Sequence, residues 1–157
     1  MASIQTKILD PSASEVSICA RWRVAEFADV LGTSVEMEEQ VLKAIAADQN
    51  RQVVLIATCD GVPAGTCLLV TSEIDPLHNV SPWLAGLYVA PKFRRLGVGR
   101  ALIQAVEKEA RSRGVPRLHL YAGNEEASYY QRLSWEVADR FDWKGLPTNL
   151  MVRELGA

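Results

Sequence analysis

The stretch "LYVAPKFRRLGVGRALI", residues 87–103, combines residue types suited to binding an anion. It is typical of a buried strand, a basic turn containing Arg94 and Arg95, and the start of a helix. A helix N-terminus offers unpaired backbone N–H groups and about half a positive charge. Gly97 and Gly99 let a bulky ligand approach the backbone, and arginine side chains suit phosphate oxygens. We interpret the turn as a diphosphate site, with a solvated basic turn as the alternative.

Two common phosphate-binding patterns do not fit this turn. A Walker loop requires Gly-Lys-Ser/Thr, whereas Arg100 and Ala101 follow Gly99. The dinucleotide fingerprint requires Gly or Ala where Leu102 stands, and its turn follows the first strand of the fold, whereas this turn comes late in the chain. The sequence therefore disfavours a kinase, an NTPase or a nicotinamide-dependent enzyme.

The composition indicates an ordinary globular domain. No repeat, low-complexity tract or linker divides the 157 residues, so we expect a single domain over residues 1–157. The formal net charge of −2 offers no general attraction to nucleic acids or anionic membranes. No secretory signal, long apolar span or metal-ligand spacing of His and Cys is apparent, so we expect a cytoplasmic protein without a bound metal.

Hydrophobic spacing and turn residues predict an alternation of strands and helices. We expect strands at residues 3–9, 53–59, 62–72, 83–89, 117–122, 136–143 and 148–155. We expect four helices: one over residues 14–31, one that begins at a capping box formed by Thr33 and Glu36, one from Val98 to a stop at Gly114, and one over residues 125–134. Asp60-Gly61 is a hairpin signal. The strand–helix–strand order over 83–122 indicates a parallel strand pair. The predicted fold class is α/β.

Two motifs in the second half of the chain resemble those of the GNAT superfamily of acyl-CoA-dependent N-acyltransferases. The first is Val89-Ala90-Pro91 followed by Arg94-Arg95-Leu96-Gly97-Val98-Gly99 and an apolar helix. The second is "NEEASYYQRLSW", with Asn124, Ala127 and Tyr130. The resemblance implies a mixed, mostly antiparallel sheet of about seven strands with helices on both faces, splayed at strands four and five. Gly86 is where we expect the bulge that begins the splay.

The resemblance also implies acetyl-CoA as cosubstrate. By position it assigns cofactor contacts to Leu87, Tyr88, Val89, Arg94, Arg95, Leu96, Gly97, Val98, Gly99, Arg100 and Asn124. The backbone of residues 87–89 is expected to pair with the pantetheine arm, and the amides of residues 95–100 are expected to bind the diphosphate.

The implied reaction is direct attack of an amine on the acetyl thioester, with Tyr130 donating a proton to the departing thiolate. The acceptor is a small-molecule amine or a peptide amino group. The segment from Asn124 to the tyrosine is one residue shorter than usual, so Tyr129 is the alternative acid. Ser134 and Trp135 stand where Gly-Phe is common.

No side chain stands out as the general base, because the strand at 83–89 lacks the glutamate that many relatives place there. Glu73, Asp75 and His78 lie in the connection before that strand, and His119 lies in the strand that follows the long helix. Residues in such a connection more often belong to a solvated loop, and a structural role is the favoured interpretation of His119.

Other functions are compatible with parts of this pattern. A non-catalytic acyl-CoA-binding sensor or interaction domain is the main alternative. Nucleic-acid binding is disfavoured by the acidic balance of charge and by the lack of aromatic stacking positions. Trp22 and Phe27 are candidates either for the acceptor pocket or for the core. We interpret the three cysteines as small buried side chains. A homodimer is one alternative for the oligomeric state.

Overall fold

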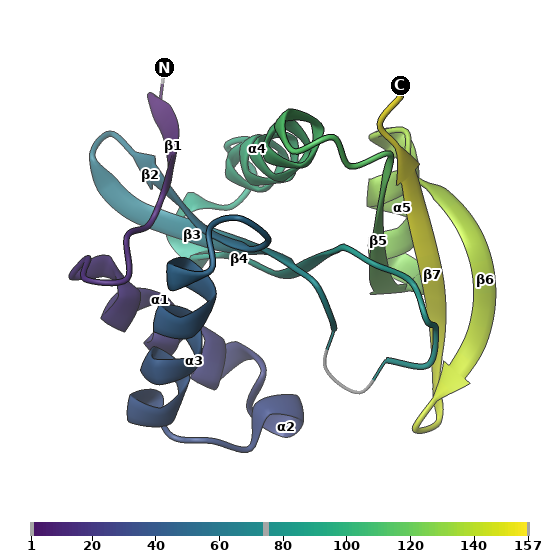
Figure 1. Ribbon diagram of the computed structural model, residues 1–157, viewed down its shortest axis with the longest axis horizontal. Coiled ribbons are helices and arrows are strands. Elements are labelled where there is room, and N and C mark those ends of the chain that lie inside the picture. Colours follow the sequence, from purple (N-terminus) through teal and green to yellow (C-terminus); the bar gives the residue numbers. More distant parts are fainter. Residues whose placement is uncertain (1, 74–75, 157) are drawn as a thin grey trace.

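A computed structural model describes residues 2–73 and 76–156, which include seven strands of one mixed sheet. The sheet has the order β1-β2-β3-β4-β5-β7-β6 (Figure 1). The strands are β1 (Ile4–Ile8), β2 (Val53–Cys59), β3 (Val62–Val70), β4 (Trp83–Val89), β5 (Arg117–Gly123), β6 (Glu136–Trp143) and β7 (Leu146–Glu154). Neighbouring strands are antiparallel except β4 and β5, which run parallel. The predicted fold class is confirmed.

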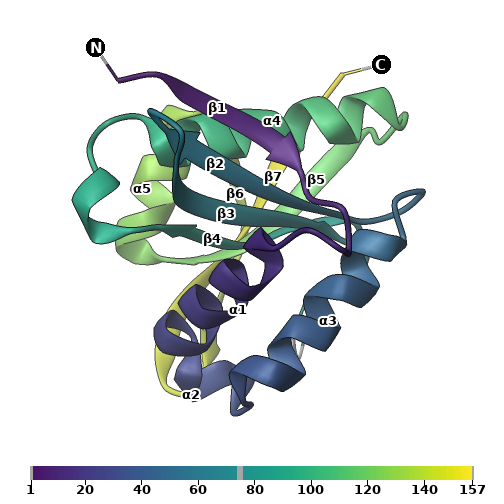
Figure 2. The same ribbon diagram turned by 90° about the vertical axis from the view of Figure 1, so that its left-hand side faces the viewer.

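Helices cover both faces of the sheet (Figures 1 and 2). They are α1 (Glu15–Glu26), α2 (Ala28–Leu31), α3 (Val35–Ala47), α4 (Val98–Ser112) and α5 (Asn124–Arg132), with a short 3₁₀ turn, η1 (Pro91–Phe93). Buried residues of α4 and α5 share one hydrophobic cluster, and those of α1 and α3 share the other. The sheet therefore separates two cores.

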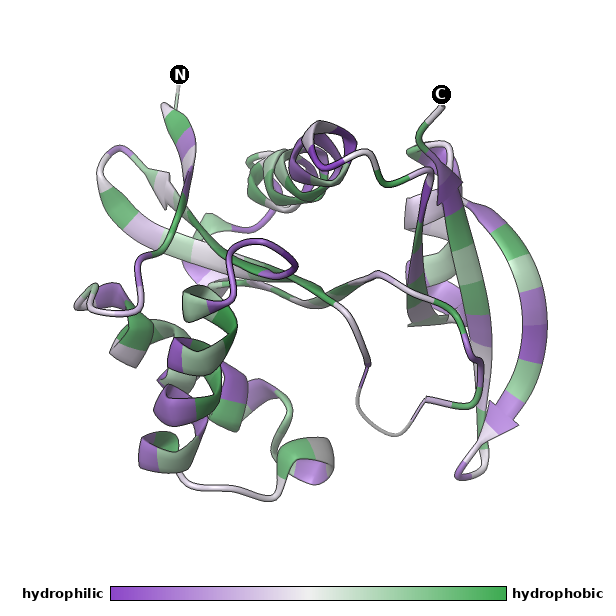
Figure 3. Cartoon of the chain, viewed as in Figure 1, coloured by the Kyte–Doolittle hydropathy of each residue, from purple (hydrophilic) through white to green (hydrophobic). Residues whose placement is uncertain are grey.

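Strand β2 shows how the sequence builds these two cores. Successive side chains of a strand point to opposite faces. Val53 and Leu55 accordingly join the cluster beneath α4, whereas Val54 and Ile56 join the cluster beneath α1 and α3. A strand that is buried on both faces has a continuous apolar run, as β2 does. Strand β6 lies at the margin of the sheet and instead mixes hydrophilic and hydrophobic residues (Figure 3).

The helix expected over residues 14–31 is instead two helices. Phe27 leaves the helical region, with φ −112° and ψ 28°, and separates α1 from α2. Its ring lies 5.7 Å from the guanidinium carbon of Arg23, so the break turns an aromatic side chain toward a buried cation. The helix that follows also begins one residue later than expected. Ser34 caps α3, and its hydroxyl accepts a hydrogen bond from the Met37 N–H at 3.1 Å.

The predicted hairpin at Asp60-Gly61 is confirmed. Asp60 has φ 50° and Gly61 has φ 81°, and Cys59 pairs with Val62 on either side of them. Positive φ at both central residues is the geometry of a type I′ turn, which matches the twist of the two strands.

The predicted bulge in β4 is also confirmed. Thr66 pairs with Tyr88 and Leu68 pairs with Ala85, so β4 contains one residue more than β3 over this step. The extra residue lies beside Gly86, whose φ of 64° is the left-handed conformation that glycine tolerates.

Beyond the bulge, β4 and β5 diverge. Among the described residues, Trp83 opposite His119 is the one registered pair between these strands. The β5-facing edge of residues 85–89 therefore lacks a partner strand within the described parts of the chain. This opening in the middle of the sheet is the splay expected from the family resemblance.

Candidate active site

A groove of about 600 Å³ follows the second half of β4 to the start of α4. It is lined by Glu26, Leu87, Tyr88, Val89, Phe93, Arg94, Arg95, Gly97, Val98, Gly99, Arg100 and Tyr129. The structure thus brings together nine of the eleven residues predicted to contact the cofactor. The two that do not line the groove within the described structure are Leu96, which is 47% exposed, and Asn124.

The first turn of α4 faces this groove with uncapped amides. The first N–H groups of a helix have no intrahelical acceptor. Gly97, the N-cap, has φ 94°, and no side chain of the described residues caps this helix end. A Cβ atom added at Gly99 would meet its nearest neighbours at 3.6 Å, which is ordinary van der Waals contact. The protein itself therefore has room for a Cβ at Gly99, in contact with Tyr129 and Val89.

The two adjacent arginines of the turn have different surroundings. Arg94 Nε donates to the Val89 carbonyl oxygen at 2.9 Å, and the Arg94 guanidinium carbon lies 5.9 Å from the Tyr88 ring centre. Arg94 therefore ties the turn to the end of β4. Arg95 is exposed, has φ 65°, and has no side-chain partner among the described residues. Its charge is available to a ligand in the groove, as is that of Arg100, which also lines the groove and is exposed.

Replacing Arg95 tests this difference. We expect Arg95→Ala to raise the KM for acetyl-CoA about tenfold at low salt, because a hydrogen bond to a charged group contributes about 1.5–3 kcal/mol and exposure reduces it. The effect should shrink with added salt. Lys108→Ala, which removes the same charge from an exposed position farther along α4, is the control. The KM for acetyl-CoA of both variants is measured by steady-state kinetics. If Lys108→Ala raises this KM as much as Arg95→Ala does, the effect comes from the net charge of the protein and not from a contact made by Arg95.

The two tyrosines of α5 face different parts of the molecule. Tyr129 is half-buried and lines the groove, with its hydroxyl 3.6 Å from the position of a Cβ at Gly99. Tyr130 is 7% exposed and packs in the core against Trp135, with ring centres 5.8 Å apart. Burial raises the pKa of both hydroxyls, and the charges of Arg100 and Arg132 partly oppose the shift at Tyr129. The expected acid, Tyr130, thus lies away from the groove lining, and its neighbour lies in it.

The other parts of the second motif have structural roles. Asn124 Oδ1 accepts a hydrogen bond from Asn149 Nδ2 at 2.9 Å, which joins α5 to β7. Ser134 has φ 73°, so it keeps the left-handed conformation for which glycine is better suited. Trp135 is buried, and its indole N–H donates to Glu107 Oε2 at 3.1 Å.

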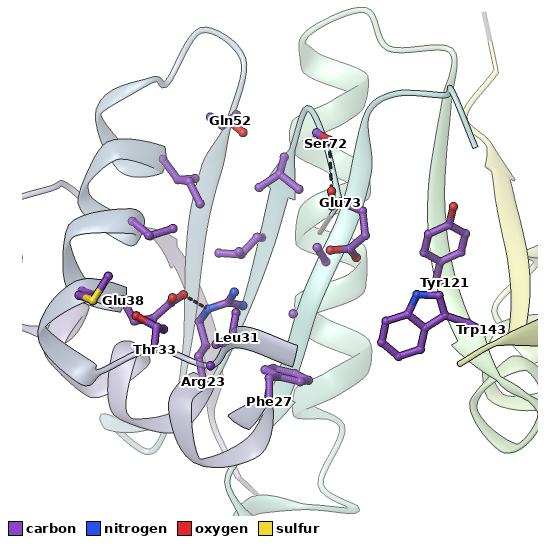
Figure 4. Close-up of a pocket in the computed structure, with 18 of the residues that line it drawn as sticks. Arg23, Phe27, Leu31, Thr33, Glu38, Gln52, Ser72, Glu73, Tyr121 and Trp143 are labelled. Atoms are coloured by element: carbon purple, nitrogen blue, oxygen red, sulfur yellow. Dashed lines mark hydrogen bonds and ion pairs between the residues drawn. The ribbon is translucent and has the colours of Figure 1, made fainter. Parts of the chain in front are cut away.

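A second cavity, of about 680 Å³, lies between α1–α3 and the ends of β3, β5 and β6 (Figure 4). Its lining is largely apolar and includes Phe27, Leu31, Met37, Val41, Ile45, Leu68, Val70, Phe141 and Trp143. Phe27, a predicted candidate for the acceptor pocket, lies here. Trp22 instead packs beside Tyr88, with ring centres 5.4 Å apart. Ala85 and Gly86 line this cavity, so the two cavities occupy successive stretches of β4.

Sequence reasoning missed a charged pair in the wall of this second cavity. Arg23 Nε donates to Glu38 Oε1 at 2.7 Å, and the two side chains are 6% and 2% exposed (Figure 4). The signal was available in part, because Arg23 falls three residues after Ala20 on the buried face of α1. A charged residue at such a position is rarely buried without a partner.

The candidate bases have distinct positions. Glu73 lines the second cavity just after β3, and its side chain projects into it (Figure 4). Asp75 lies outside the described residues. His119 is buried, and burial lowers the pKa of its imidazole. Its Nδ1 lies 3.0 Å from the Pro82 carbonyl oxygen, so Nδ1 carries the proton that it donates.

His78 is part of a hydrogen-bond cluster that fixes the segment before β4. The Tyr121 hydroxyl accepts from the backbone N–H groups of Leu77 and His78 at 3.0 and 3.1 Å. Because its lone pairs are used, its hydrogen goes to His78 Nδ1 at 2.8 Å. His78 Nε2–H then donates to Asp139 Oδ2 at 2.8 Å, and this bond lowers the pKa of Asp139. The cluster connects this segment to β5 and β6.

The cysteines, possible metal ligands and long helices add no further candidate site in the described residues. The three cysteines are buried and free, and burial raises the pKa of Cys67 to about 12. Among residues 2–73 and 76–156, no group of three or more His, Cys, Asp or Glu side chains could hold a metal ion. None of the helices in this part of the chain is both long and apolar enough to cross a membrane.

Comparison with known proteins gives the family. Residues 19–135 match the model of the Acetyltransferase (GNAT) family. Because this match covers most of the chain, the protein belongs to the GNAT acetyltransferase family.

Individual relatives are distant in sequence. A Bacillus subtilis (strain 168) protein provisionally named as an acetyltransferase is 21% identical over 134 residues, which are 84% of each chain. A GNAT-family acetyltransferase from Streptococcus pneumoniae has a TM-score of 0.74 at 17% identity, over 98% of this chain and 100% of that chain.

Two further structures contain a cofactor. A provisionally named acetyltransferase from Salmonella typhimurium, solved with acetyl-CoA, has a TM-score of 0.76 at 16% identity, over 97% of this chain and 94% of that chain. An aminoglycoside 6'-N-acetyltransferase in complex with coenzyme A has a TM-score of 0.77 at 12% identity, over 98% of both chains. At these identities the likeness shows the shared fold.

Proposed function

We propose that this protein transfers an acetyl group from acetyl-CoA to a primary amine of a small molecule or peptide, by direct attack within a ternary complex. One observation carries the proposal. Successive residues of β4 line two different cavities, with Ala85 and Gly86 in the apolar one and Leu87, Tyr88 and Val89 in the groove that ends at α4. A cosubstrate in the groove and an acceptor in the apolar cavity would meet at the bulge. The proposal assigns the whole chain to this one activity.

The groove supplies the interactions that acetyl-CoA needs. The open edge of β4 can pair with the amides of a pantetheine arm as an added strand does. The uncapped amides of α4 and the charge of Arg95 suit a diphosphate. The acetyl-CoA and coenzyme A bound to two structures of the same fold support this assignment. Leu96 and Asn124 do not line the groove within the described structure, so the proposal gives their side chains no contact with the cofactor, and the amide of Leu96 stays a candidate for the diphosphate.

We propose that Tyr129 is the proton donor for the thiolate that leaves when acetyl-CoA reacts. Its side chain lines the groove together with Leu87 and Val89 of β4, along which the cosubstrate would lie, whereas Tyr130 is packed in the core. Because burial raises the pKa of Tyr129 above the usual value of about 10, its hydroxyl keeps its proton at pH 7. It can therefore act as a general acid, donating its proton to the sulfur as the C–S bond breaks, and it regains a proton from solvent when the products leave.

The attacking amine must also lose a proton. Deprotonating an amine of pKa about 10.4 at pH 7 costs about 4.6 kcal/mol in water. Glu73 lines the acceptor cavity, and we propose that its carboxylate receives this proton directly or through a water molecule. The apolar lining lowers the cost further, because desolvation disfavours the ammonium form.

Glu73→Gln tests the role of this carboxylate while keeping its size. At pH 7 we expect kcat/KM for the amine to fall at least about tenfold, because the base is lost. The deficit should narrow as the pH approaches the pKa of the amine, since the free amine then no longer needs a base. A deficit that stays constant across a pH series would indicate a structural role for Glu73.

Two measurements test the proposed function as a whole. Calorimetry with coenzyme A tests the groove, and release of free thiol from acetyl-CoA with a panel of amino acids, polyamines, aminoglycosides and peptides tests transfer. Thiol release with one class would support the proposal and identify the acceptor. Binding of coenzyme A without thiol release from any class would favour the sensor alternative, and failure to bind coenzyme A would contradict both.

A further inference from the structure

The buried pair in the wall of the acceptor cavity engages only the Nε–H donor of Arg23. Arg23 is 5% exposed, and Glu38 engages its Nε. The terminal nitrogen Nη1 is buried and has no hydrogen-bond partner among the described residues. A buried N–H on a charged group is costly to leave unpaired, so such groups usually meet a ligand or an ordered water. Nη1 is therefore a donor without an acceptor in the wall of a cavity.

The backbone of β4 is shaped around this nitrogen. A Cβ atom added at Gly86 would collide with Arg23 Nη1. Gly86 is also the left-handed residue of the bulge. The chain thus has a residue without a side chain where the guanidinium reaches β4. Because Gly86 lines the acceptor cavity and Leu87 lines the groove, Nη1 lies beside the boundary between the two.

The surroundings favour an anionic oxygen at this donor. Phe27, Leu31 and Ile45 contribute apolar surface around the cavity, and low polarity strengthens a charge-assisted hydrogen bond. The planar guanidinium presents its donors in a fixed fork that matches a carboxylate. A polycationic acceptor would instead bring positive charge toward a buried cation.

The net charge of the cavity favours an acceptor that carries both a carboxylate and an ammonium group. Arg23 and Glu38 neutralise each other, and Glu73 adds a carboxylate to the cavity, so a bound carboxylate alone would add to an excess of negative charge in a largely apolar site. An acceptor that carries both a carboxylate and an ammonium group adds no net charge. The same molecule would direct its amine away from Arg23, toward the rest of the cavity.

We propose that Arg23 binds the carboxylate of the acceptor, and that the acceptor is an amino acid with an apolar side chain. Glu38 is a positioning residue, which holds Nε so that Nη1 faces the ligand. This inference rests on the proposed acetyl transfer and specifies its substrate class.

The test compares amines that differ only in the carboxylate. Thiol release is measured with L-phenylalanine, L-methionine and L-leucine and with their carboxamides. We expect kcat/KM to be at least about tenfold higher for the acids, the ratio expected of one charge-assisted contact. This preference would oppose intrinsic reactivity, because the α-amine of a carboxamide loses its proton more readily than that of the acid.

The double variant Arg23→Gln/Glu38→Gln removes both charges and leaves no lone buried ion. We expect the preference for acids to disappear through a higher KM, with the carboxamides changed less than about threefold. Coenzyme A affinity serves as the control for folding. If the double variant fails to bind coenzyme A, Arg23→Lys replaces it, since lysine keeps the charge beside Glu38 without the fork.

The possible outcomes separate this inference from the proposed function. Acetylation of carboxamides or polyamines in preference to the acids would overturn the inference and leave the transferase activity intact. An equal fall in kcat for acids and carboxamides would also overturn it, because Arg23 would then serve the acetyl carbonyl. If no amine releases thiol, calorimetry of the coenzyme A complex with L-phenylalanine decides, and absence of binding overturns the inference.

Discussion

Tyr129→Phe should lower kcat by about 10²- to 10⁴-fold, the range expected when a general acid is lost. The substitution keeps the ring and its position beside the first turn of α4, and it removes only the hydroxyl that faces the groove. Coenzyme A affinity and the free energy of unfolding should change little. Single-turnover measurement of thiol release isolates the chemical step from product release.

Tyr130→Phe is the matched control on the same helix. Tyr130 is packed against Trp135 in the core, so loss of its hydroxyl should leave turnover close to that of the wild type. A larger loss at position 130 than at 129 would return the acid to the residue expected from the sequence motif. No loss at either position would exclude both tyrosines from the chemical step.

Gly99→Val should weaken coenzyme A binding more than about 100-fold. A branched side chain would hold the diphosphate away from the α4 amides, and loss of two charge-assisted hydrogen bonds of at least 1.5 kcal/mol each, about 3 kcal/mol together, gives this factor. The protein itself has room for the first added atom, since a Cβ at this position would contact its neighbours at 3.6 Å. Calorimetry on folded protein gives the affinity.

A smaller substitution at the same position separates binding from folding. Gly99→Ala should stabilise the fold by about 0.5–1 kcal/mol, because glycine costs conformational entropy in a helix. It should nevertheless weaken coenzyme A binding, by less than valine does. Gly97 cannot serve for this comparison, because its φ of 94° would strain any side chain. Equal affinities for glycine, alanine and valine at position 99 would contradict the diphosphate assignment.

The parts of the site that could be predicted from the sequence are those that depend on neighbouring residues. The strand, turn and helix over residues 83–112 carry their glycines and arginines within one continuous stretch, so their arrangement follows from local backbone geometry. The glycine at position 86, inside a predicted strand, likewise indicated the bulge that the structure has there. Leu96 belongs to the same stretch, but its side chain turns outward, because contiguity in sequence does not decide the direction of each side chain in a turn.

The parts that could not be predicted depend on rotation and on tertiary packing. Adjacent residues of a helix point about 100° apart, so a one-residue uncertainty in the motif decides whether Tyr129 or Tyr130 faces the groove. The Arg23–Glu38 pair forms only because α1 packs against α3, and no local pattern joins residues that lie on separate helices. The cytoplasmic location and the homodimer stay predictions from the sequence.

The divergence of β4 and β5 gives the sheet two inner margins in addition to those at β1 and β6. Outer margins invite pairing with other chains, and proteins usually protect them with charges or bulges. Here the inner margin along residues 85–89 is at most half exposed, because Ala85 is buried and residues 86–89 are intermediate in exposure. A polypeptide strand inserted beside it would need about 4.7–4.9 Å to each neighbour and space for side chains on both faces, yet α4 and α5 pack one face. We therefore expect this opening to exclude a further peptide strand and to suit a narrower ligand without side chains, such as the pantetheine arm proposed above.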